Sequence, residues 1–197
     1  MRRICTLAFV LSLVPAVAHA SLISFHASLS GANESPSNAS PGIGEADIVF
    51  DTVVHTMSID VTYSGLLAPV TASHIHCCTA VPGAGTAIVA TQTPSFTGFP
   101  STQSGSYSHL FDLTLSSSFN GAFVTAHGGT VSQAEADLVA GALAGRAYLN
   151  IHSQQFPGGE IRGFLSPVPE PASLVLLASG LAGAGVRRWR QRRVDAI

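Results

Sequence analysis

The sequence contains no lysine, and all nine of its basic side chains are arginines. Seven of these arginines lie within the first three residues or between residues 187 and 193. Residues 21–167 therefore carry nine acidic side chains against only Arg146 and Arg162, a formal charge of −7. An acidic region without a basic patch argues against nucleic-acid binding, which depends on lysine and arginine contacts to phosphate. It also disfavours binding of anionic polysaccharide by charge alone, and leaves neutral glycans and cation-bridged contacts open.

Catalytic signatures are missing as well. The chain has no Gly-x-Ser-x-Gly nucleophile elbow and no phosphate-binding Walker loop. No pair of carboxylates stands out as the acid and base of a glycan hydrolase. We therefore expect that this protein is not an enzyme.

The N-terminus has the pattern of a secretory signal peptide. Arg2 and Arg3 form a short positive region, an uncharged stretch covers residues 4–17, and Ala18-His19-Ala20 is a small-x-small cleavage site. The pattern predicts a signal helix over residues 1–20, with cleavage after Ala20.

The C-terminus has a second, equally ordered pattern. Pro169-Glu170-Pro171 is followed by an uncharged segment, residues 172–186, and then by an arginine-rich end, residues 187–193. At 1.5 Å per residue the uncharged segment spans about 22 Å as a helix, less than the roughly 30 Å of a hydrocarbon core. It predicts a marginal membrane helix, with the arginines in the cytoplasm and the preceding domain outside.

These three features resemble the PEP-CTERM sorting signal of Gram-negative bacteria, here over residues 167–193. The resemblance implies that the tail holds the protein at the membrane until an exosortase-type transpeptidase cuts near Pro169-Glu170-Pro171. The alternative is a permanent C-terminal membrane anchor.

Between the two ends, short β-prone runs alternate with clusters of Gly, Pro, Ser and Asn, as in an antiparallel β-sandwich or barrel. Alternation is clear in residues 57–63, where every second residue is apolar. One short helix is expected from a capping box at Ser132 and Glu135, ending at Gly145. The expected strands are residues 22–29, 44–50, 56–63, 70–77, 86–91, 105–115, 146–152 and 160–165.

Five segments follow one another along the chain: Ala27-Ser28-Leu29-Ser30-Gly31-Ala32, Tyr63-Ser64-Gly65-Leu66, Ala72-Ser73-His74-Ile75-His76, Ala147-Tyr148-Leu149-Asn150-Ile151-His152-Ser153 and Gly159-Glu160-Ile161-Arg162-Gly163. With them, about residues 25–165 resemble the CHRD domain, a module named from the animal protein chordin, and we expect the domain to cover residues 21–166. The resemblance rests on these five segments, which occur in the family's order. The family implies a β-sandwich-like fold and no established enzymatic activity or ligand.

Three of the expected strands each carry two polar residues that flank an isoleucine. Residues two apart on a strand project from the same face. If the three strands are neighbours in register, their polar side chains form one cluster. The residues concerned are His74, His76, Asn150, His152, Glu160 and Arg162.

Two interpretations of this cluster stay open. In the structural one, Glu160 pairs with Arg162 or Arg146, and the histidines bond to backbone carbonyls or to Asn150. In the other, His74 and His76 bind a Zn²⁺ or copper ion, with His152 or a cysteine completing the set.

Cys77 and Cys78 follow the histidine pair directly, and Cys5 leaves with the signal peptide. An oxidising compartment favours a disulfide. The Cα atoms of adjacent residues, 3.8 Å apart across a trans peptide, are closer than disulfides usually require. We expect a vicinal disulfide, with metal ligation beside His74 and His76, or a bond to another chain, as alternatives.

The sequence therefore predicts an exported, non-catalytic binding or structural module that passes through a membrane-anchored intermediate to the cell surface or extracellular matrix. Its expected partners are the secretion machinery, an exosortase-type transpeptidase and the membrane, with extracellular polysaccharide or other surface proteins as candidates. No cofactor is expected in this interpretation. The main alternative is a zinc- or copper-binding or redox protein that uses the His-Ile-His-Cys-Cys strand.

Overall fold

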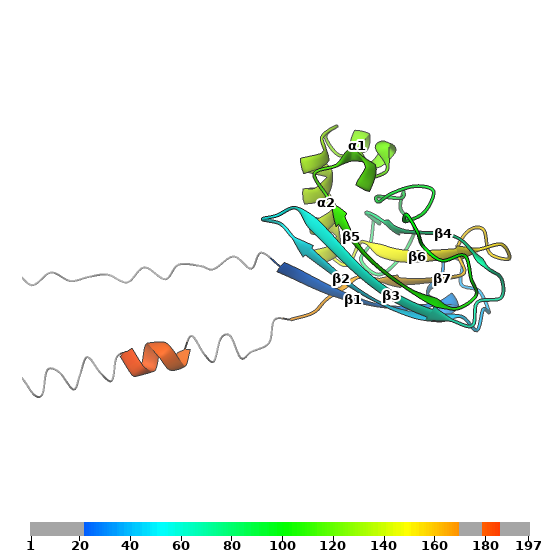
Figure 1. The fold of residues 1–197 in the computed structure, drawn as a ribbon, viewed down its shortest axis with the longest axis horizontal. Coiled ribbons are helices and arrows are strands. Elements are labelled where there is room, and N and C mark those ends of the chain that lie inside the picture. The colour runs from blue at the N-terminus through cyan, green and yellow to red at the C-terminus, as the bar shows by residue number, and fades with distance from the viewer. Residues whose placement is uncertain (1–21, 170–178, 186–197) are drawn as a thin grey trace, which may run out of the picture.

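The computed structural model describes residues 22–169 and 179–185. In this part of the chain eight strands form one sheet, and every paired neighbour is antiparallel. The spatial order is β4-β6-β7-β1-β2-β3-β5, with β8 beside β1, and the sheet curls (Figure 1). The strands are β1 (Leu22–Ser30), β2 (Ile43–Asp51), β3 (Thr56–Ser64), β4 (Val70–His76), β5 (Gly105–Asp112), β6 (Tyr148–Ser153), β7 (Ile161–Phe164) and β8 (Ser166–Pro167).

The hydrophobic core lies inside the curl. On β3 the alternation seen in the sequence places Met57, Ile59 and Val61 in the core, while Asp60 and Thr62 are exposed. The expected mainly-β antiparallel fold is therefore confirmed. It is barrel-like rather than layered, because one continuous curled sheet supplies most of the core-facing side chains, with helical and loop residues completing the core.

The strand expected over residues 86–91 is not formed. This segment makes only two isolated bridges, from Val89 to His76 and from Thr91 to Phe119. Its β-prone residues serve instead to cover the open edge of β4, where the Ala90 and Thr91 amides both donate to the Ile75 carbonyl.

Two α-helices are present where one was expected, α1 (Gly121–Ala126) and α2 (Val131–Leu143), besides 3₁₀ turns η1 (Gly31–Asn33) and η2 (Ser116–Ser118). The two α-helices pack on one side of the curled sheet (Figure 1). The expected capping box at Ser132 is wrong, because Thr130 is the N-cap and accepts from the Gln133 amide at 3.2 Å. Glu135 is thereby free to contact the His55 ring, at 2.8 Å.

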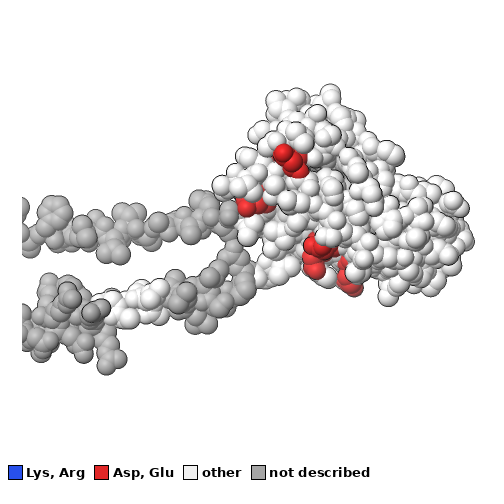
Figure 2. Space-filling model, in the orientation of Figure 1, with Lys and Arg blue, Asp and Glu red and all other residues white. Residues whose placement is uncertain are grey.

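The predicted terminal signals fall mostly outside the described residues. The signal peptide, Glu170, Pro171 and most of the expected tail helix lie there, whereas residues 179–185 are helical and exposed. Among the described residues, no helix has the length and apolar character needed to span a bilayer. On the face of the domain shown in Figure 2, isolated acidic side chains are visible and no arginine is.

Candidate metal centre

The polar pairs foreseen on three strands do lie on adjacent strands. β4 pairs with β6 and β6 with β7, so that His74, Asn150 and Arg162 form one cross-strand row. His152 lies opposite Ala72, and its side chain joins the two histidines of β4 on the same face. The intervening isoleucines of the three strands are fully buried in the core on the other face.

His74, His76 and His152 come together as a group. Each offers one ring nitrogen, and these three nitrogens lie within 4.8 Å of one another. The closest pair is His74 Nε2 and His152 Nε2, at 3.0 Å. Two nitrogens bound to one tetrahedral zinc at 2.0–2.1 Å lie roughly 3.4 Å apart, so small side-chain shifts would place all three around one ion.

The other ring nitrogen of each histidine contacts a backbone carbonyl. His74 Nδ1 is 3.1 Å from the Pro94 oxygen, His76 Nδ1 is 2.8 Å from that of Ala87, and His152 Nδ1 is 2.8 Å from that of Pro157. Because a carbonyl oxygen only accepts, each Nδ1 carries the proton. Each neutral ring therefore directs an Nε2 lone pair into the group, which is the orientation that metal-binding histidines take.

Burial keeps these rings neutral. It lowers the pKa of His74 from 6.5 to about 3, helped by the neighbouring His76 and His152, and that of His76 to about 4. Burial also lowers the pKa of His152. At neutral pH the lone pairs of His74 and His152 thus face each other, and His76 Nε2 is buried without a hydrogen-bond partner among the described residues. A bound cation would satisfy all three nitrogens.

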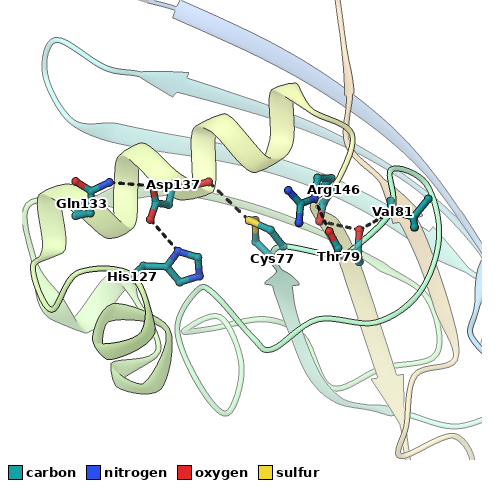
Figure 3. Close-up of a disulfide and its surroundings, with 8 residues drawn as sticks. Cys77, Thr79, Val81, His127, Gln133, Asp137 and Arg146 are labelled. Carbon is teal, nitrogen blue, oxygen red and sulfur yellow. Dashed lines mark hydrogen bonds and ion pairs between the residues drawn. A yellow bond between two sulfur atoms is a disulfide. The ribbon is translucent and has the colours of Figure 1, made fainter.

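The cysteines do not join this group. Cys77 and Cys78 are joined by a disulfide at the end of β4, and Cys77 points into the core with no exposed surface. The disulfide packs against helix α2, where Cys78 Sγ is 3.7 Å from the Asp137 carbonyl oxygen and His127 contacts the Asp137 carboxylate at 2.8 Å (Figure 3). Strand alternation explains the position of Cys77, since the residue after His76 must face away from the histidines. Cys78 lies beyond the end of β4 and is held beside Cys77 by the disulfide.

The expected pairing of Glu160 with Arg162 or Arg146 is not formed. β7 begins only at Ile161, and the Glu160 carboxylate turns to accept from Ser40 Oγ at 2.6 Å and the Leu67 amide at 2.7 Å. Arg146 donates instead to the Thr79 carbonyl. Asn150 does not contact the histidines through its buried Oδ1, which has no hydrogen-bond partner among the described residues.

The partner that sequence reasoning missed is Glu34. Arg162 donates to the carbonyls of Asn33 and Gly85, and its Nε lies 3.9 Å from the Glu34 carboxylate. Both charged side chains are buried. No local pattern could have revealed this pair, because more than a hundred residues separate the two along the chain.

Comparison with known proteins places the whole described domain in one family. The model of the CHRD domain matches residues 25–165, and that of the PEP-CTERM protein-sorting motif matches residues 167–193. No curated protein and no solved structure matches the chain. Both modules are sorting or structural in kind, and the sorting motif implies export to the surface or extracellular space. The chain therefore belongs to the CHRD-domain family, and it carries a C-terminal PEP-CTERM sorting motif.

Proposed function

We propose that an exosortase-type transpeptidase sorts this protein to the cell surface, where its CHRD domain is a non-catalytic module that binds a transition-metal ion. His74, His76 and His152 are the proposed ligands. The observation that carries the proposal is the convergence of three Nε2 lone pairs, each fixed by a carbonyl contact at the opposite ring nitrogen.

The ligand chemistry favours zinc or copper. Neutral imidazoles suit Zn²⁺ and copper ions, whereas Ca²⁺ and Mg²⁺ require oxygen ligands that this group of residues does not contain. Three protein ligands leave a fourth position for water or for a group from a partner. Because none of the three ligands is charged, the bound ion would add positive charge to an otherwise acidic domain.

The test is metal binding by the exported protein. After equilibration with Zn²⁺ or Cu²⁺ and desalting, elemental analysis is expected to find about one ion per chain. The variants His74→Ala and His152→Ala should lose the ion, because each removes one of three ligands. His109→Ala is the matched control, since His109 is exposed on β5 and outside the group.

A purely structural role for the histidines gives a different result. In that case wild type holds no more than traces of either metal, and the histidine variants change only the melting temperature. That outcome would overturn the metal proposal and leave the surface module without a bound ion.

A further inference from the structure

A cleft of about 640 Å³ opens on the same polar face of the sheet, and none of the three histidines lines it. One wall is the segment around η1, residues 32–35, and the other is the turn at residues 83–85. Its floor includes Arg162 and Phe164 of β7 and Ser28 of β1. The volume lies within the range of small-molecule sites in proteins.

Arg162 fastens both walls of this cleft to the sheet. Its guanidinium donates to the Asn33 carbonyl on one wall and to the Gly85 carbonyl on the other, the latter at 2.9 Å. The same group lies over the rings of Tyr148 and Phe164, at 4.7 and 5.5 Å from their centroids. The cleft is therefore preformed, which lowers the entropy lost when a ligand binds.

Glu34 gives the cleft an unused acceptor. The residue is only 9% exposed and lines the cleft, and its Oε1, which has almost no accessible surface in the unliganded domain, has no hydrogen-bond partner among the described residues. Arg162 near its Oε2 offsets the carboxylate charge. A buried carboxyl oxygen without a partner is satisfied by a hydroxyl group, which brings no further charge into the cleft.

The remaining lining groups fit a polyhydroxylated ligand. Ser28, Ser35 and Ser166 contribute small polar side chains, and Phe164 contributes an aromatic ring. His26, also in the lining, contacts the carboxylates of Glu45 and Asp47 at 2.9 and 2.8 Å, and these exposed acids repel an anionic ligand. We infer that this cleft binds a neutral sugar unit of an oligo- or polysaccharide, independently of the metal ion.

The experiment titrates the exported protein with cellotetraose, maltotetraose and mannotetraose, and with the acidic tetragalacturonate, by calorimetry. At least one neutral tetrasaccharide is expected to bind, and tetragalacturonate is not. Glu34→Gln and Phe164→Ala should each weaken that binding about tenfold, the effect of losing one charge-assisted hydrogen bond or one aromatic contact. Melting curves of both variants establish that they are folded.

Asp60→Asn is the matched control for Glu34→Gln, because Asp60 is an exposed acid on β3 outside the cleft. It should leave the affinity unchanged, as should prior removal of metal with EDTA. Three results would each overturn the inference: none of the neutral sugars binds, tetragalacturonate binds as well as they do, or the affinity survives both cleft substitutions.

Discussion

Arg162 is a buried cation whose guanidinium joins three parts of the chain, the sheet, the η1 segment and the turn at residues 83–85. Arg162→Ala should lower the free energy of unfolding by about 3–5 kcal/mol, because it leaves two carbonyls without their donor and the buried Glu34 carboxylate without its ion-pair partner. Urea denaturation measures the change, with Arg146→Ala as the comparison, since Arg146 is only half-buried and its Nε contacts a single carbonyl. A loss below about 1 kcal/mol would mean that Arg162 acts as a surface charge does.

Glu34 makes stability depend on pH in the direction opposite to most carboxylates. Burial raises its pKa from 4.5 to about 7, against the smaller opposing effect of Arg162. Below the lower value the carboxyl is protonated in both the folded and the unfolded chain. Between about pH 4.5 and 7 the unfolded chain releases this proton while the folded domain keeps it, so the rise in pH destabilises the folded state, at a cost of up to about 3 kcal/mol.

Glu34→Gln should remove that cost, and the variant should gain stability over wild type near pH 8 but not near pH 4. Urea denaturation at both pH values tests the prediction. An equal difference at the two pH values would show that the Glu34 pKa is not raised.

In the metal-free protein the three histidines affect the pH dependence of stability in the direction opposite to Glu34, because they destabilise the folded state as the pH falls. Their pKa values are lowered by burial, that of His74 from 6.5 to about 3. As the pH falls below 6.5, the unfolded chain takes up protons that the folded domain does not, so the folded state loses stability until the pH passes the folded pKa values. Melting temperatures of the EDTA-treated Glu34→Gln protein should therefore drop from about pH 7 to pH 5, and His74→Gln should reduce the drop. A flat profile would contradict this account.

At the scale of the elements, helix α2 packs closely against the disulfide at Gly141. A Cβ atom there would lie 2.3 Å from both Cys77 Sγ and Cys78 Sγ. Gly141→Ala should destabilise the domain by about 1–3 kcal/mol, because neither the buried disulfide nor the helix can move away freely. The matched control is Gly121→Ala at the start of α1, where an added Cβ meets nothing within 4 Å. Similar melting temperatures for the two variants would mean that α2 shifts at little cost.

The sequence predicted most of these elements because their patterns are local. Seven strands were found within a few residues of their bounds, since the β runs are short and bounded by turn residues. Residues 86–91 have the same composition as a strand, but they cover the edge of β4 through isolated bridges and do not form a regular ladder, which the composition does not reveal. Helix α1 was missed because its six residues, Gly121–Ala126, are too few to show a helical period.

The candidate site was predictable to the extent that it follows strand alternation. The shared face of His74 and His76 follows from their spacing, and the resemblance to a known family supported the strand that carries His152. The carbonyls that orient the three rings, at Pro94, Ala87 and Pro157, belong to loops. Loop conformation depends on tertiary contacts rather than on a periodic pattern, so these partners had to come from the structure.

At the scale of the whole molecule, the prediction to test is that the protein loses its C-terminal tail when it is sorted to the cell surface. Cleavage near Pro169 should give a mature surface species whose intact mass excludes the uncharged segment and the arginine-rich end, residues 172–193. Removal of the N-terminal 20 residues should appear in the same spectrum. Replacing Glu170 by Ala is expected to leave the tail on. A surface species that retains residues 172–193 would instead identify a permanently anchored protein.

The first and last strands of the domain pair with each other, so the chain enters and leaves the domain at the same end. β8 pairs with the beginning of β1, Pro167 opposite Phe25 and Ser166 opposite His26, while Arg162 lies beside Ser30 at the far end of β1. Figure 1 shows the chain entering and leaving on one side and the β6–β7 turn at the opposite end. Any tether, at either end of the chain, therefore holds the domain by the same pole. The β6–β7 turn, which contains Pro157, lies at the other end and would be the part of the domain farthest from such a tether.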